Sequence, residues 1–451
     1  MKNKNRPFFY EDKKAFWPKL LFFLIVIIIF IFWGIRVPRI RQILGWRIID
    51  GGSFAKSLFV QVSTPNPQQF RVSVIYPTID TPSEEVIFAE NLDELSENNL
   101  MSDQNPLITP TPGITWFIEE LQPTISPLLP YGESGNSAAI IPPVFEYQDY
   151  QNDGPAVLSA VLRFFGKHES QYLIAKSVKP DYLDPNVSFE ELELYVGETY
   201  PEFGCIVRIN GNIEILNNLI LAGLPVVIRI ETEKGFSAWE GDDRIDSRYI
   251  LVTGYDNASN LIFFQDPFKG DQQSVSSEKL MSDWYPYLRE YLVVYPTEKE
   301  PVVQQILGDS REKKSNLNNA LEKFRTDSDM LPENIFTWLN TAIVLVREEQ
   351  YENAWNIYKS TLNLNLPQRY FLYNPSLYTA AFRTGNADEL TTLTGFTLRI
   401  NSHSEESWLW KGWANILRGE LEDAKSCFQK ALSIRPNYRD AVYALKFLEK
   451  Q

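Results

Sequence analysis

Side chains that could make or break covalent bonds are scarce in this chain. Its 451 residues include two cysteines and two histidines, His168 and His403. So few such side chains, so far apart, exclude a cysteine-rich zinc site, a histidine metal cluster and a disulfide-stapled scaffold. We therefore expect neither a metal nor a cofactor. In the central part of the chain, Cys205 and His168 are the only Cys and His, so a Cys/His pair could come only from these two.

The same central part carries polar motifs in a definite order. Gln148 precedes the run Asn-Asp-Gly-Pro-Ala at 152–156, and an apolar, helix-like segment follows that run. Arg248 opens a strand-like run that continues into Gly-Tyr-Asp at 254–256, and the next such run ends in Asp-Pro at 266–267. The pattern predicts a helix that begins near Asp153 and strands that carry Arg248 and Asp266.

This order resembles the C39-like branch of the papain-like cysteine peptidases. That family has a Gln, then Asn-Cys-Gly-Pro-Ala before a helix, a later strand that begins with His, and an Asp-Pro after the next strand. The resemblance implies an α+β papain-like domain over 142–297. In the family, a thiolate at the helix N-terminus attacks, the His takes its proton, the Asp orients the His and the Gln stabilises the oxyanion.

Carried onto this sequence, the resemblance puts Gln148 at the oxyanion position and Asp266 at the orienting position. The nucleophile position is Asp153 and the base position is Arg248. Arginine stays protonated, so it cannot act as a general base. We therefore expect no catalytic residue among these four degenerate positions.

Asp153 has three possible roles. It could be the N-cap of the helix, it could be a catalytic carboxylate, or it could form an ion pair with Arg248 in place of the thiolate–imidazolium pair. A relocated Cys205/His168 pair is a further alternative, against a Cys within a strand and an exposed loop His. The acidic loop at 241–246, which would edge the cleft in the family fold, is most simply a solvated turn.

The C-terminal part of the chain has a repeating helical pattern. The 34-residue frame of the tetratricopeptide repeat is matched at seven positions: Trp408, Gly412, Gly419, Ala424, Phe428, Ala431 and Pro436. Weaker copies precede it, one of them over about 371–404, and a capping helix is expected at about 438–450. The pattern predicts an all-α solenoid over 301–451, whose concave face could bind a peptide or a partner protein.

The N-terminus is basic and apolar, whereas the rest of the chain is acidic. Residues 1–47 hold ten Lys/Arg and two acids, so they carry +8 of the −15 net charge and the remainder carries −23. Residues 20–35 contain no charge, and Trp17 and Trp33 lie where an interfacial aromatic belt would be. We predict a basic cytoplasmic N-terminus at 1–15 and a transmembrane helix at 16–35. The acidic body disfavours nucleic acid as a partner.

The sequence therefore predicts a single-pass bacterial cell-membrane protein. A juxtamembrane segment and proline-containing linker over 36–141 would carry the other domains, and residues 36–451 would lie outside the cytoplasm. The leading function is non-catalytic: a pseudoenzyme domain and a repeat array that bind a peptide or partner protein through the cleft or the repeat groove. The alternatives are an active C39-like cysteine peptidase and a structural spacer in an envelope complex.

Overall fold

A computed structural model describes residues 136–141, 143–235, 242–362, 364, 366–367 and 369–450. The predicted segments 1–15 and 16–35, and the linker up to residue 135, lie outside the described residues. None of the helices that the structure describes is both long and apolar enough to cross a bilayer. All described residues belong to one compact unit of the chain.

An antiparallel sheet organises the first half of this unit. Its strands are β1 (Ser137–Ala139), β2 (Phe203–Arg208), β3 (Val226–Glu233), β4 (Ile245–Asp256), β5 (Leu261–Asp266), β6 (Gly270–Ser276) and β7 (Tyr291–Pro296). The order across the sheet is β2-β7-β3-β4-β5-β6. Strand β1 pairs with the end of β4, with Ala139 opposite Gly254. The sheet thus begins before residue 142, the lower limit that the sequence predicted.

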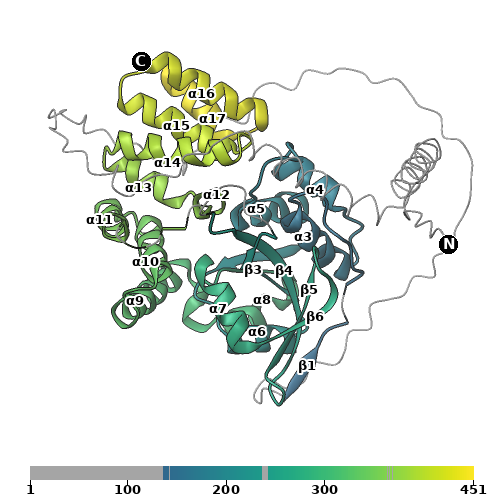
Figure 1. Cartoon of the computed structure of the whole chain (residues 1–451). Helices are drawn as coiled ribbons and strands as arrows, with labels where there is room; N and C mark the ends of the chain where they lie inside the picture. Colours follow the sequence, from purple (N-terminus) through teal and green to yellow (C-terminus); the bar gives the residue numbers. More distant parts are fainter. Residues whose placement is uncertain are drawn as a thin grey trace, which may run out of the picture. The chain divides into compact units, whose positions relative to one another are not determined.

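Helices cover both faces of this sheet (Figure 1). One face holds α3 (Asp153–Phe164), α4 (Gln171–Val178) and α5 (Phe189–Thr199). The other face holds α6 (Ile213–Leu221), α7 (Ser277–Trp284) and α8 (Glu300–Leu307). Because both faces are buried, the central strands are apolar on alternating sides: Leu251 of β4 packs under α3, and Val252 packs on the opposite face.

Helix α8 belongs to this sheet domain and not to the repeat array. The sequence placed the boundary between 297 and 301. Val303, Ile306 and Leu307 of α8 are buried in the core on the α6 face of the sheet. The predicted boundary is therefore too early by one helix, because α8 has an apolar face that the sheet domain covers.

The rest of the chain is helical. Its helices are α9 (Lys313–Met330), α10 (Ile335–Arg347), α11 (Tyr351–Thr361), α12 (Tyr370–Tyr373), α13 (Ser376–Arg383), α14 (Ala387–Ile400), α15 (Glu405–Leu417), α16 (Leu421–Ile434) and α17 (Arg439–Leu448). Gly412 lets α15 and α16 approach, since a Cβ there would lie 2.3 Å from Cε1 of Phe428. Helix α17 lies where the capping helix was predicted.

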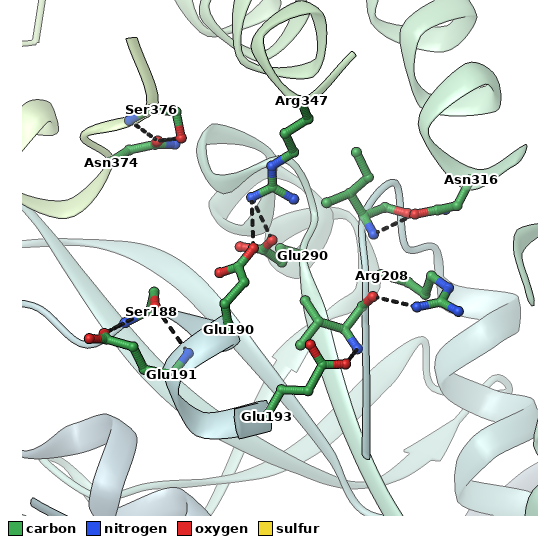
Figure 2. Close-up of polar contacts among 12 residues, drawn as sticks. Ser188, Glu190, Glu191, Glu193, Arg208, Glu290, Asn316, Arg347, Asn374 and Ser376 are labelled. Carbon is green, nitrogen blue, oxygen red and sulfur yellow. Dashed lines mark hydrogen bonds and ion pairs between the residues drawn. The ribbon is translucent and has the colours of Figure 1, made fainter. Parts of the chain in front are cut away.

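The sheet domain and the helices share a hydrophobic core. Ile209, Tyr287 and Leu288 of the sheet domain pack in one cluster with buried residues of α9, α10 and α13. Asn316 of α9 adds a double hydrogen bond, because its side chain accepts from the Ile209 amide at 3.0 Å and donates to the Ile209 carbonyl at 2.9 Å (Figure 2). The two parts are therefore joined by packed core and not by a linker alone.

Candidate functional site

Asp153 lies at the start of α3 and faces the neighbouring strand. Its Oδ2 accepts a hydrogen bond from the Tyr249 amide of β4 at 2.8 Å. The N-cap position belongs to Asn152, which makes no side-chain capping bond. The prediction that Asp153 caps α3 is therefore wrong by one residue: its side chain fastens the helix to the strand. Gly154 permits this approach, since a Cβ there would lie 3.3 Å from the Tyr249 ring.

Burial and nearby positive charges shift the pKa of the Asp153 carboxyl group in opposite directions. Burial raises its pKa, and the Tyr249 amide and the positive charges of Arg229, Arg248 and Lys179 act in the opposite direction. Lys179 is itself buried, and burial lowers its pKa. Three cations, Arg229, Arg248 and Lys179, thus act on the single carboxylate of Asp153.

Arg248 forms its ion pair with Asp266. The Arg248 Nη1 lies 3.2 Å from the Asp266 Oδ2, and both side chains are buried. The other Asp266 oxygen accepts the Phe268 and Lys269 amides, and the Phe268 ring covers the guanidinium at 4.3 Å. No ion pair joins Asp153 to Arg248 in the described part of the chain, so the third of the possible roles of Asp153, an ion pair with Arg248, is wrong. The strand register explains this, because Arg248 meets the turn after β5.

Gln148 lies beside the same turn. The backbone amide of Gln148 donates to the Pro267 carbonyl at 2.9 Å. The Oε1 atom of its side chain is buried and has no hydrogen-bond partner among the described residues. The fold therefore brings Gln148, Asp153, Arg248 and Asp266 to one place, as the sequence motifs predicted. Three of the four are buried, and the Cys and His of the C39-like pattern are replaced at these positions by Asp153 and Arg248.

Cys205 and His168 do not form a second site. Cys205 lies on β2 opposite Val294, and burial raises the pKa of its thiol. His168 is exposed in the loop after α3. No contact joins the two side chains where the structure describes them, and a thiol with a raised pKa is a poor nucleophile.

The acidic loop before β4 is not a solvated turn where the structure describes it. Asp242 is buried and forms a two-bond ion pair with Arg369, at 2.8 Å and 2.6 Å. Asp246 accepts from Lys234 and from the Tyr373 hydroxyl. The loop therefore contacts the helical region, and the prediction failed because the partners there, Arg369 and Tyr373, lie 127 residues away in the sequence. Residues 236–241, including Trp239 and Glu240, lie outside the described residues.

The cavity that the structure describes was not predicted from the sequence. It has a volume of about 470 Å³ and lies between α5 and the repeat helices. Its wall includes Glu190 and Glu290 from the sheet domain and Arg347, Asn374 and Arg435 from the helices. None of the four degenerate positions lines it. The acid-rich segment at 189–199 was the feature of the sequence that could have pointed to the cavity. The sequence alone does not reveal which arginines those acids contact.

Ion pairs cross this cavity. The Arg347 Nη2 lies 2.8 Å from Glu290 and 3.6 Å from Glu190 (Figure 2). Glu191 closes a capping box with Ser188 and pairs with Arg435 of the helical region. Burial raises the pKa of Glu290 to about 7 in spite of Arg347. The sheet domain thus presents a row of carboxylates to arginines of the helices.

Arg229 forms part of the same wall. It is 6% exposed, donates to Asn186 at 2.8 Å and to Ser247 at 3.0 Å, and pairs with no carboxylate within 4 Å in the described residues. Its guanidinium lies 5.0 to 5.6 Å from the ring centres of Tyr249, Tyr287 and Tyr373. Cation–π contacts of this kind hold a buried cation in place and leave it able to attract a negative group.

Comparisons with known proteins were made with this geometry in hand. The Tetratricopeptide repeat model matches residues 405–438. Among solved structures, a candidate C39-like peptidase from Bacillus anthracis is similar over 35% of this chain and 97% of its own, at 15% identity and a TM-score of 0.28. The peptidase domain of Streptococcus ComA, a bi-functional ABC transporter, is similar over 34% and 98%, at 18% identity and 0.27.

A third structure, MamA, is similar over 32% of this chain and 83% of its own, at 15% identity and a TM-score of 0.27. No curated protein matches the chain. The match at 405–438 has the bounds of the frame that the sequence predicted. Together with the meeting of the four motif positions, this confirms the prediction of a C39-like domain followed by tetratricopeptide repeats.

Proposed function

We propose that this protein is a membrane-anchored, non-catalytic C39-like domain whose repeat array binds a peptide or a partner protein. The observation that carries the proposal is the Arg248–Asp266 ion pair. It occupies the place of the base and its orienting acid with a guanidinium that cannot accept a proton. Asp153, bound to the Tyr249 amide, takes the place of the nucleophile. Together, the Asp153–Tyr249 hydrogen bond and the Arg248–Asp266 ion pair connect α3, β4 and the turn after β5.

The cavity beside α5 is the binding site that we propose. It is lined by both signs of charge and by polar side chains of the helical region, such as the buried Asn374 and the half-buried Ser376. A mixed surface of this kind favours hydrogen bonding to an extended peptide over the burial of a purely apolar ligand. Repeat arrays commonly use such concave surfaces for protein recognition.

A peptide-display selection on the purified full chain tests the binding site. Thr379 lines the cavity, so Thr379→Trp should fill it and weaken the selected peptides at least tenfold. The matched control is Thr392→Trp, on the exposed side of α14, which should leave binding unchanged. Equal binding by both variants would place the peptide elsewhere on the chain.

The alternative of an active cysteine peptidase is tested on the same preparation. Incubation with a peptide library and with a thiol-reactive probe should give no hydrolysis and no labelling of Cys205. Turnover that is lost on Cys205→Ser would overturn the non-catalytic proposal. The double variant Asp153→Cys with Arg248→His tests whether a Cys and a His at these two positions give peptidase activity.

The membrane anchor is part of the proposal and rests on the sequence of residues 16–35. Deletion of residues 1–35 should move the chain from the membrane fraction to the soluble fraction. Protease added to intact spheroplasts should digest the remainder of the chain if residues 36–451 lie outside the cytoplasm. Protection from the protease would indicate the opposite orientation, with residues 36–451 in the cytoplasm. The spacer alternative predicts that neither peptide selection nor crosslinking finds a ligand for the cavity.

A further inference from the structure

Three carboxyl groups from the two domains meet where α15 begins. Asp184 follows α4 of the C39-like domain, and Glu405 and Glu406 form the first turn of α15. One oxygen of each lies within 4.8 Å of the others. Asp184 and Glu405 are each 1% exposed. Asp184 and Glu405, which lie 221 positions apart in the sequence, therefore share a small volume with Glu406.

One oxygen in this group has no partner. The Glu405 Oε2 is buried and accepts no hydrogen bond from any residue that the structure describes. The other oxygen of Glu405 lies 3.5 Å from the Arg435 Nη1. A carboxylate oxygen that is removed from water and left without a donor costs free energy, so it points to a group that could satisfy it.

The charges that face the group do not balance. Two cations are near: Lys179, whose Nζ donates to the Asp184 carbonyl at 2.7 Å, and Arg435, which pairs with Glu191 and Glu405. Against them stand the three carboxylates and Glu191. The ionised group carries an excess of two negative charges, which equals the charge of one divalent cation.

The ligand atoms and the route of access define the ion. Carboxylate oxygens are hard ligands, which suit Ca²⁺ and Mg²⁺ better than the softer transition metals. Glu406 and Glu191 also line the cavity, so a hydrated ion has a path from solvent. We propose that Asp184, Glu405 and Glu406 bind one hard divalent cation, which ties the C39-like domain to the repeat array.

Calorimetric titration of the full chain in mild detergent, after treatment with EDTA, tests the site. CaCl₂ and MgCl₂ are titrated separately at pH 7.5, and at least one of them should bind with one ion per chain and raise the thermal midpoint. Glu405→Gln and Asp184→Asn should weaken that binding at least tenfold and abolish the rise of the midpoint. Glu420→Gln, an exposed acid at the start of α16, is the matched control and should bind as the wild type does.

Protons are the competing way to neutralise the group. If neither ion binds the wild type at millimolar concentration, the proposal is wrong. In that case, a rise of the thermal midpoint in Glu405→Gln that is larger at pH 9 than at pH 6 would show that protons neutralise the group. Binding that persists unchanged in Glu405→Gln and Asp184→Asn would also overturn it. Should either of these variants fail to fold, Glu406→Gln decides, because Glu406 is only half-buried and its loss should leave the core intact while it weakens the ion at least tenfold.

Discussion

The ion pair between Arg369 and Asp242 should govern how firmly the two domains are joined. Its two hydrogen bonds, from Nε to Oδ1 at 2.8 Å and from Nη2 to Oδ2 at 2.6 Å, connect the loop before β4 to the start of α12. The side chains are 5% and 0% exposed. The change we consider is Arg369→Met, which keeps most of the aliphatic stem and removes the guanidinium.

The expected cost follows from the burial of the partner. The variant removes the Arg369 guanidinium from an Asp242 carboxylate that is 0% exposed. Removing one member of a buried ion pair typically costs about 3–5 kcal/mol, because the remaining charge stays desolvated. At about 2–4 °C per kcal/mol for a large domain, the thermal midpoint should fall by about 6 °C or more.

Thermal unfolding of the full chain, followed by calorimetry, measures this cost. The exposed residue Arg325 of α9 provides the control, and Arg325→Met should shift the midpoint by less than about 0.5 kcal/mol in equivalent free energy. The double variant Arg369→Met/Asp242→Asn should recover at least about 1 kcal/mol relative to Arg369→Met, since it removes the stranded charge. A loss in Arg369→Met no larger than in Arg325→Met would refute the argument.

Three further predictions concern single positions. Gly412→Ala should destabilise the chain by about 1–3 kcal/mol, because its Cβ would lie 2.3 Å from the Phe428 ring, whereas Gly395→Ala, with space around it, should stabilise by up to about 1 kcal/mol; chemical denaturation distinguishes the two. Cys205 should react with a thiol reagent at pH 7.5 far more slowly than a model thiol, because burial raises its pKa; rapid labelling of the native protein would contradict this. Burial raises the pKa of Glu231 to about 7, so the folded state holds a proton that the unfolded state loses, and this contribution to stability disappears as pH rises from about 4.5 to 7. Glu231→Gln should remove that part of the pH dependence and be the more stable form at pH 8; an unchanged pH profile would refute the assignment.

The sequence predicted what local pattern and motif order can encode. The repeat frame at 405–438 follows from the spacing of small and aromatic residues such as Gly412 and Phe428, which the packing of α15 on α16 requires. The meeting of Gln148, Asp153, Arg248 and Asp266 followed from the order of the motifs. The repeat frame depends on residues that are near one another in the sequence. The meeting of the four positions was predicted through the resemblance, since Asp153 and its partner Tyr249 lie 96 residues apart.

What the sequence could not predict lies between the domains. The Asp242–Arg369 pair and the Arg435–Glu191 pair join residues 127 and 244 positions apart. Nothing in the composition of 241–246 distinguishes a loop that binds an arginine from a loop that faces water. The burial of α8 against the sheet was missed for the same reason, since an amphipathic helix does not reveal which of two neighbours covers its apolar face.

The replaced catalytic positions and the interface make one consistent argument. Arg248 and Asp266, at the base and orienting positions of the C39-like pattern, are 8% and 1% exposed and form an ion pair with each other. In the cavity beside α5, Arg347 and Arg435 meet the carboxylates of the C39-like domain. Because the same α5 helix both packs under the sheet and contacts the array, a ligand that enters the cavity must compete with these ion pairs. If the charges of a bound peptide take over the ion pairs of Arg347 and Arg435, its affinity should fall as the salt concentration rises. If the peptide leaves these ion pairs intact, its affinity should not depend on salt.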